Sequence, residues 1–84
     1  MDVYELTKLT RQNAMRVIGV RLRSLRASSG LSPREVARKV GVSESVVLSW
    51  EAGSTAPGVD QVASYIAAVA CIINQELIEI TMTL

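Results

Sequence analysis

All nine lysine and arginine residues of the 84-residue chain lie between positions 8 and 39, where Glu35 is the only acid. This segment therefore carries a net charge of +8, whereas residues 40–84 hold five acids and no base. Guanidinium and ammonium groups at this density bind phosphates, so the segment is a candidate surface for a polyanion. The alternative is that these side chains only cover solvated helix faces.

Few other side chains in the sequence are suited to chemistry. The chain contains no histidine, and its single cysteine, Cys71, lies in an apolar run that is typical of an inert core thiol. These counts exclude a Cys/His zinc site, a disulfide framework and a histidine-dependent catalytic triad. Glu76 and Glu79 are close in sequence, but the pattern around them places both on the solvent side of a strand. We therefore expect no enzyme, no metal site, no cofactor and no small-molecule ligand.

The elements that must position the basic side chains are predicted to be helices. Over residues 10–28, apolar residues recur at steps of three and four, and the intervening positions are mostly arginine. This spacing predicts an amphipathic helix with its basic side outward. Its expected inner residues are Ala14, Val17, Ile18, Leu22 and Leu25.

A second helix is predicted from its caps. Ser32, Pro33 and Glu35 have the spacing of a capping box with proline at the first helical position. The short helix that they open is expected to end at Gly41, because glycine readily adopts the left-handed conformation of a C-cap.

Two more helices and a strand are expected after Gly41. Ser43 is the predicted cap of a helix over residues 44–52, and a turn-rich loop leads to a helix over 59–70. The expected inner residues of this last helix are Val59, Val62, Ile66 and Val69. From position 78 the pattern alternates, which predicts a β-strand with apolar positions at Ile78, Ile80, Met82 and Leu84.

The predicted strand must pair with something, because a single strand leaves its backbone groups unsatisfied. Its partner is expected to be the same strand of a second copy, residues 70–73 folded back, or residues 2–6. The sequence thus predicts one domain, with an N-terminal extension over residues 1–9, a helical core over 10–70 and a strand segment for dimerisation over 71–84.

The segment from Pro33 to Ala52 resembles the helix-turn-helix of the phage repressor/Cro-like (XRE) family. The family's pattern of a small residue, then a glycine, then an aliphatic residue is matched by Ala37, Gly41 and Val47. The surrounding frame is similar too: Ile18-Gly19, Arg21-Leu22-Arg23, Leu25-Arg26, Gly30-Leu31-Ser32, Trp50-Glu51-x-Gly53 and Pro57. The resemblance covers about residues 18–70 and implies a mainly α, compact, lambda-repressor-like domain of four to five helices.

The resemblance also implies roles for particular residues. The second helix of the motif would lie in the DNA major groove, with base contacts from Glu44, Ser45, Val46 and Ser49. Phosphate contacts would come from Ser32 and Arg34 at the start of the first motif helix. Independently of the resemblance, the basic segment offers Arg21 and Arg23 for phosphates, and Ser43 is a further candidate. Trp50 would belong to the structural frame, and Arg26 and Glu51 would form an ion pair.

The motif departs from the family pattern at the residues that read DNA. Pro33 stands where the family often has a glutamine that touches DNA. The helix from Glu44 to Ser49 contains no Arg, Lys, Gln or Asn, the side chains that make bidentate contacts with guanine or adenine. Base discrimination from this helix is therefore expected to be weak.

These observations predict a regulator that binds double-stranded DNA. We expect a repressor that forms a homodimer through its C-terminal strand and binds a symmetric operator. A phage or plasmid regulator and an antitoxin both fit. The alternative is a protein-interaction module, such as an antitoxin that binds a toxin partner and binds DNA weakly or without sequence preference. The acidic N-terminus does not resemble a secretion signal, and the 15-residue uncharged stretch over 61–75 is shorter than the ~20 residues of a membrane span. We therefore expect a cytoplasmic protein of bacterial or phage origin with no membrane partner.

Overall fold

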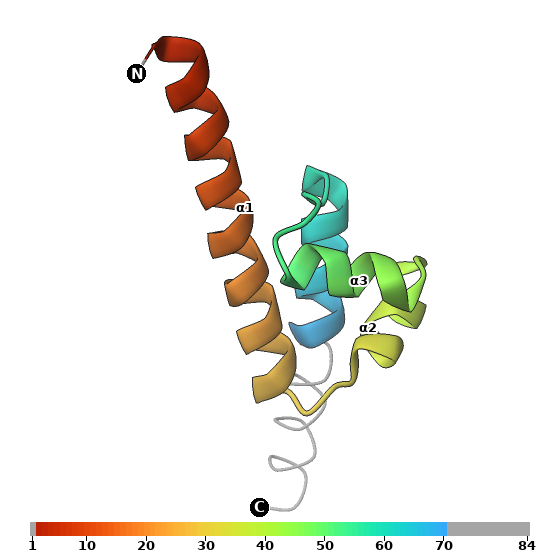
Figure 1. Ribbon diagram of the computed structural model, residues 1–84. Coiled ribbons are helices and arrows are strands. Elements are labelled where there is room, and N and C mark those ends of the chain that lie inside the picture. The colour runs from red at the N-terminus through yellow and green to blue at the C-terminus, as the bar shows by residue number, and fades with distance from the viewer. Residues whose placement is uncertain (1, 71–84) are drawn as a thin grey trace, which may run out of the picture.

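The computed structural model describes residues 2–70, and the regular structure in this range is entirely helical (Figure 1). Helix α1 spans Val3–Ser28, α2 spans Pro33–Val40 and α3 spans Glu44–Glu51. A fourth helix runs from residue 59 to 70, where the described residues end. The prediction of a mainly α domain is therefore confirmed for these residues. The predicted strand, with Ile78, Ile80, Met82 and Leu84, lies outside them.

Helix α1 begins seven residues earlier than the sequence pattern predicted. Asp2 is its N-cap, and its Oδ1 accepts a hydrogen bond of 2.8 Å from the Glu5 amide. The hydroxyls of Thr7 and Thr10 each donate to the carbonyl oxygen four residues earlier, at 2.8 Å. Residues 3–9 therefore continue α1, so the N-terminal extension is not a separate segment and residues 2–6 are not a strand for the tail to pair with.

The caps of α2 and α3 form as predicted. The Ser32 hydroxyl accepts from the Glu35 amide at 3.1 Å, and the Glu35 carboxylate accepts from the Ser32 amide at 3.2 Å. Gly41 ends α2 in the left-handed conformation, with φ at 87°. The Ser43 hydroxyl then accepts from the Val46 amide at 3.4 Å. The left-handed Gly41 and the Ser43 cap define the turn between the two helices of the motif.

Helix α3 is the centre of the fold, because both α1 and α2 pack against it. The core that joins them consists of Leu22, Leu31, Val36, Ala37, Val47, Trp50, Tyr65 and Val69. Gly19 brings α1 against the end of α3: a Cβ at this position would lie 2.5 Å from the Trp50 carbonyl oxygen and 2.7 Å from the Glu51 carbonyl oxygen. The two backbones therefore touch where α3 ends.

The face that α1 turns toward α3 differs from the predicted one. Of the five predicted inner residues only Leu22 is buried, and the exposed ones are Ala14, Val17, Ile18 and Leu25. The contact instead follows Gly19, Leu22 and Arg26, because the glycine permits the closest approach to α3. Apolar periodicity selects the broader apolar face, and on this helix only the edge of that face at Leu22 meets the core.

The inner side of the fourth helix matches the prediction only in part: Val69 is buried and Val62 is half-buried, as expected. Val59 and Ile66, both expected inside, are 87% and 47% exposed, whereas Tyr65 is completely buried. The Tyr65 hydroxyl has buried hydrogen-bonding partners on α1 and α3, which hold this residue inward. No helix among residues 2–70 combines the length and apolar character that a membrane span requires.

Candidate nucleic-acid interface

The outer side of α3 carries the side chains that the resemblance assigned to base contacts. Glu44 and Ser45 are exposed, and Val46 and Ser49 are half-buried. Leu48 lies on the same side and is 46% exposed. The outer side of α3 therefore presents one carboxylate, one exposed serine and one leucine to a partner.

Two of the serine hydroxyls on α3 already have partners. The Ser45 hydroxyl lies 3.0 Å from that of Ser43. The Ser49 hydroxyl donates to the Val46 carbonyl oxygen at 2.8 Å, and it lies 2.7 Å from the Thr55 hydroxyl, which must then act as the donor. Ser49 can therefore offer a base only its remaining lone pair, and Ser45 is the more available of the two.

Thr55 is a neighbour of the candidate interface that the sequence analysis missed. It belongs to the turn-rich loop after α3, and its amide also donates to the Ser49 carbonyl oxygen at 3.3 Å. The clustering of Ser54 and Thr55 after Gly53 predicted only a turn. A hydroxyl in that turn gave no sign of which helix residue it would meet.

The N-terminus of α2 offers less to a phosphate than the same place in an uncapped helix. Pro33 has no amide hydrogen, and the Glu35 amide is bonded to the Ser32 hydroxyl. The Glu35 carboxylate also brings negative charge to this end. Arg34 is exposed beside it, so its side chain is the main feature at this point that attracts an anion.

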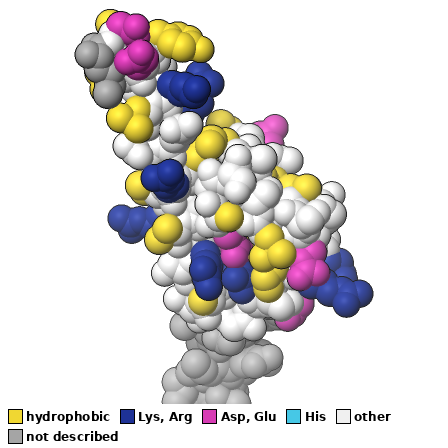
Figure 2. All heavy atoms as spheres, viewed as in Figure 1, with side chains coloured by type: hydrophobic (Ala, Val, Ile, Leu, Met, Phe, Trp, Pro, Cys, Tyr) yellow, Lys and Arg dark blue, Asp and Glu magenta, His cyan; other side chains and the backbone are white. Residues whose placement is uncertain are grey.

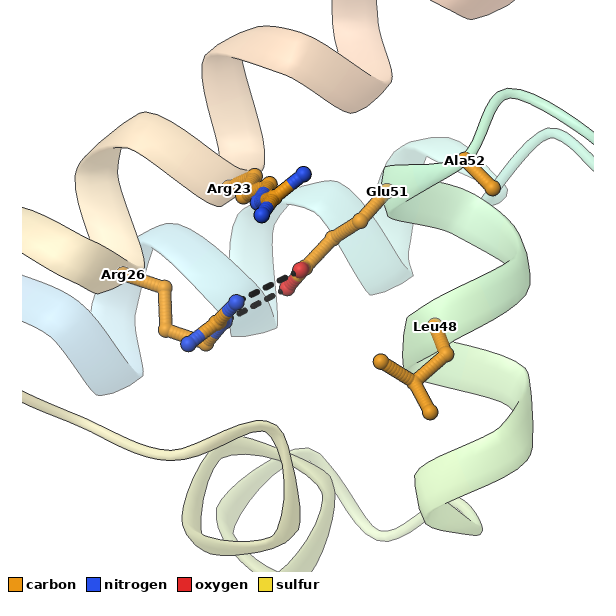
Figure 3. Close-up of a pocket in the computed structure, with 5 residues that line it drawn as sticks. All are labelled: Arg23, Arg26, Leu48, Glu51 and Ala52. Atoms are coloured by element: carbon orange, nitrogen blue, oxygen red, sulfur yellow. Dashed lines mark hydrogen bonds and ion pairs between the residues drawn. The ribbon is translucent and has the colours of Figure 1, made fainter.

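The arginines of α1 lie on different sides of the molecule. Arg23 borders a hollow of about 290 Å³ together with Arg26, Leu48, Glu51 and Ala52 (Figure 3). Arg21 is two residues earlier, about 160° around the helix, and is exposed on the side away from α3. The structure therefore brings Arg23, and not Arg21, to the outer side of α3.

Charge on the molecular surface is distributed in separate groups. In the face shown in Figure 2, basic side chains lie in several places along α1 and beside α2, with acidic and hydrophobic side chains between them. The acids at the starts of α2 and α3 are Glu35 and Glu44. A polyanion on the outer side of α3 would therefore meet separated positive groups with acids among them.

A buried polar network holds α3 from its inner side. The Arg26 guanidinium donates to both carboxylate oxygens of Glu51 at 2.8 Å each, as a bidentate pair, and to the Leu31 carbonyl oxygen at 3.0 Å. The ion pair that the resemblance implied is therefore present. The Tyr65 hydroxyl, which sequence reasoning did not assign, lies 2.8 Å from Glu51 Oε2 and 2.9 Å from the Leu22 carbonyl oxygen.

The network changes the protonation of its members. Burial favours the neutral form of Glu51, but hydrogen bonds from Arg26 and Tyr65 outweigh it, so the pKa of Glu51 lies below its usual value. Burial and the neighbouring Glu51 carboxylate raise the pKa of Tyr65. Glu51 is therefore charged and Tyr65 neutral at pH 7, and α1, α3 and the fourth helix are joined by one network.

Residues 17–71 match a family model described as a helix-turn-helix domain, which is well over half of the chain. The chain belongs to the helix-turn-helix domain family. This family of XRE-like DNA-binding domains agrees with the resemblance carried by Ala37, Gly41 and Val47, and it indicates a DNA-binding regulator. The searches of curated proteins and of solved structures each returned no match. The helix-turn-helix match begins inside α1, so residues 3–16 of that helix precede the family domain.

Proposed function

We propose that this helix-turn-helix protein is a transcriptional repressor that binds a two-fold symmetric DNA operator as a homodimer in the cytoplasm. The observation that supports this most directly is the position of α3. The Arg26–Glu51–Tyr65 network and the contact at Gly19 hold its inner side, while its outer side is open beside Arg23. A rigidly held helix with one exposed side fits the major groove.

The side chains of this interface divide into those that contact bases and those that contact phosphates. Ser45 donates to or accepts from a base edge, and Glu44 accepts from the amine of a cytosine. Val46 is half-buried against the core, so only part of its side chain remains for a thymine methyl group. Arg23 and Arg34 bind phosphates, with the hydroxyls of Ser32 and Ser43 near the helix starts. Most of the affinity therefore comes from phosphate contacts, and most of the sequence preference comes from Ser45 and Glu44.

Repression follows from occupancy, because a bound dimer covers DNA that other proteins need. Two copies on a symmetric site place their α3 helices in half-sites about one helical turn apart. The sequence prediction that residues 78–84 join the copies lies outside the described residues and stays a prediction.

Leu48 favours a second candidate function. A leucine that is 46% exposed between Ser45 and Ala52 on the outer side of α3 gives this side an apolar centre. Protein interfaces have such centres, with polar residues around them. In this alternative the outer side of α3 binds a protein, such as the toxin partner of an antitoxin, and binds DNA weakly.

Selection of bound fragments from random duplex DNA at physiological salt tests the proposed function. We expect a two-fold symmetric site to be enriched. Ser45→Ala should change the preferred sequence at one position in each half-site, with little change in the dependence of affinity on salt. Arg34→Ala should lower the slope of log affinity against log salt by about one and leave the preferred sequence unchanged.

The matched control for Arg34→Ala is Arg38→Ala, which removes the same charge one turn later in α2, from another exposed position. It should reduce the salt slope by less than Arg34→Ala does. Binding without any preferred sequence, or no binding at all, would contradict the repressor and favour the protein-interaction alternative.

A further inference from the structure

We propose that the side of α1 that faces away from the core is a self-association surface, on which a second copy of this chain packs its own α1 in the antiparallel direction. We call this surface the outer face of α1; its residues are Val3, Leu6, Thr10, Asn13, Val17 and Val20. The inference goes beyond the proposed function, which needs two copies but does not say how α1 takes part.

The first observation is that about half of α1 has no tertiary support from the other helices of residues 2–70. Every residue from 3 to 14 is exposed, and this part of α1 extends past the other helices (Figure 1). Isolated helices of about 12 residues are marginal in water, and most helical stability in proteins comes from packing. The cap at Asp2 provides only local stabilisation. A partner surface would supply the packing that residues 3–14 lack.

The second observation is the spacing of the exposed apolar residues. Successive residues of the outer face are separated by alternating steps of three and four, which is the pattern of the contact positions in a coiled coil. The apolar ones are well exposed: Val3 is 80%, Leu6 55%, Val17 58% and Val20 66% exposed. Each lies far around the helix from the Gly19–Leu22–Arg26 side that touches α3; Val17, for example, is about 160° from Gly19.

The surface is also slightly concave at its N-terminal end. Val3, Leu6, Thr7, Thr10 and Arg11 line a shallow hollow there. An apolar side chain from a second helix can enter such a hollow between the ridges of α1.

Charge determines which occupant fits and in which direction. Asp2 and Glu5 lie at the start of α1 and are followed by Lys8 and Arg11, whereas the second half carries Arg16, Arg21, Arg23 and Arg26 and no acid. A parallel partner would place these arginines beside their own copies, which is repulsive. An antiparallel partner places the acidic end of each helix against the basic half of the other and also opposes the two helix dipoles. The charges at the two ends of α1 therefore favour an antiparallel partner on the outer face.

In one register of the antiparallel pair, apolar residues face apolar residues and polar residues face polar residues. Val3 then lies opposite Val20 of the second copy, and Leu6 lies opposite Val17. Thr10 and Asn13 meet at the centre, where the hydroxyl and the amide can bond across the pair. Two apolar layers flank this polar centre on each side, so a shift of register would bury Thr10 or Asn13 against valine or leucine. Such a polar centre selects register and direction.

The first test is the mass of the full-length protein in solution, measured by sedimentation without DNA. We expect a concentration-dependent dimer whose dissociation constant rises at least tenfold in Val17→Asp. Val17 is exposed and outside the core, so the helical far-ultraviolet signal of the core should be retained. Val59→Asp is the matched control, because it makes the same change at a residue that is 87% exposed on the fourth helix.

The second test is the direction of pairing. In a Cys71→Ser background, Leu6→Cys and Val17→Cys variants are oxidised separately and as a mixture. Because a disulfide forms only between closely opposed residues, the antiparallel register predicts a fast mixed disulfide between position 6 and position 17. Fast formation of both unmixed disulfides instead would overturn the antiparallel direction.

The remaining outcomes separate this proposal from the others. A monomeric wild-type protein, or a dimer that Val17→Asp leaves intact, would overturn self-association through α1. A dimer lost in Ile80→Asp and retained in Val17→Asp would assign pairing to the tail and overturn it as well. Because these measurements contain no DNA, their failure would leave the proposed DNA binding to be judged by the selection experiment alone.

Discussion

The two sides of α3 are built from different kinds of residue. Its inner side holds Val47 and Trp50 in the core and Glu51 in a bidentate ion pair, with Gly19 against its last carbonyl groups. Its outer side presents Glu44, Ser45 and Leu48, none of which makes bidentate contacts with guanine or adenine. The inner side thus fixes the helix in one orientation, while affinity for DNA must come from arginines on neighbouring helices. Substitutions on the inner side should therefore change stability, and those outside should change binding.

The largest loss of stability is expected from Glu51→Gln, on the inner side of α3. This change leaves the Arg26 guanidinium largely buried without its counter-charge, since the side chains of the pair are only 14% and 4% exposed. Breaking a buried pair from one side costs about 3–5 kcal/mol, and we expect a loss near 3 kcal/mol because glutamine keeps the shape. Urea denaturation measures it, and Glu44→Gln, on the outer side of the same helix, is the control. Equal losses of stability in both variants would contradict the difference between the inner and outer sides of α3.

The next largest effect is expected from Gly19→Ala. In an exposed helix interior this change stabilises by roughly 1 kcal/mol. Here the added Cβ would lie 2.5 Å from the Trp50 carbonyl oxygen, which belongs to the backbone. We expect a net loss of about 2–3 kcal/mol, as for other overpacked contacts. Gly58→Ala is the control, because its Cβ would meet nothing closer than 3.6 Å; a stabilised Gly19→Ala protein would show that α1 and α3 are not in contact.

Removal of the Tyr65 hydroxyl should have a smaller effect. Tyr65→Phe keeps the buried ring and removes one hydrogen bond to the network, with partners 2.8 Å and 2.9 Å away. A buried hydrogen bond to a charged group contributes about 1.5–3 kcal/mol, and Arg26 still neutralises Glu51, so we expect a loss near 1.5 kcal/mol in urea denaturation. The double variant Glu51→Gln/Tyr65→Phe should lose less stability than the sum of the losses in the two single variants, because the residues share a network.

The residues of this inner side were predictable to different degrees. The caps at Ser32 and Ser43 are local patterns, so the sequence predicted them together with the short helices that they open. The Arg26–Glu51 pair connects residues 25 positions apart, and only the family resemblance pointed to it. Neither a local sequence pattern nor the family resemblance indicated the role of Tyr65. Periodicity placed Ile66 inside, because apolar character alone does not tell which neighbour on a helix has a buried hydrogen-bonding partner.

The outer surfaces were harder still to predict. The start of α1 depended on Asp2, a cap that lies eight residues before the apolar pattern from which the helix was predicted. The direction in which α1 turns its broad apolar face depended on Gly19, since a glycine marks a close contact only once its neighbour is known. Of the candidate base contacts, exposure supports Ser45 and Glu44 more than Val46 and Ser49, which face partners of their own.

A fall in pH should lower the stability of the fold through protonation of Glu51. Its pKa in the folded protein is lower than the 4.5 of an unperturbed glutamate, because the hydrogen bonds of Arg26 and Tyr65 outweigh the effect of burial. The unfolded chain therefore takes up a proton first, so the stabilisation by Glu51 is complete above about pH 4.5 and is lost as the pH falls through the folded pKa. Urea midpoints from pH 7 to pH 3 should fall less steeply in Glu51→Gln, and parallel curves would contradict this.

The smallest effects on stability, and the clearest on binding, are expected from Arg23→Ala and Arg21→Ala. Both side chains are exposed, so each variant should unfold within about 0.5 kcal/mol of the wild type. Arg23 borders the outer side of α3 and Arg21 lies across the helix from it. On a random duplex too short for two copies, Arg23→Ala should therefore lower the salt slope by about one, and Arg21→Ala should leave it unchanged. Equal slopes would mean that DNA does not lie along α3, since two arginines of the same charge on opposite sides of α1 cannot both face it.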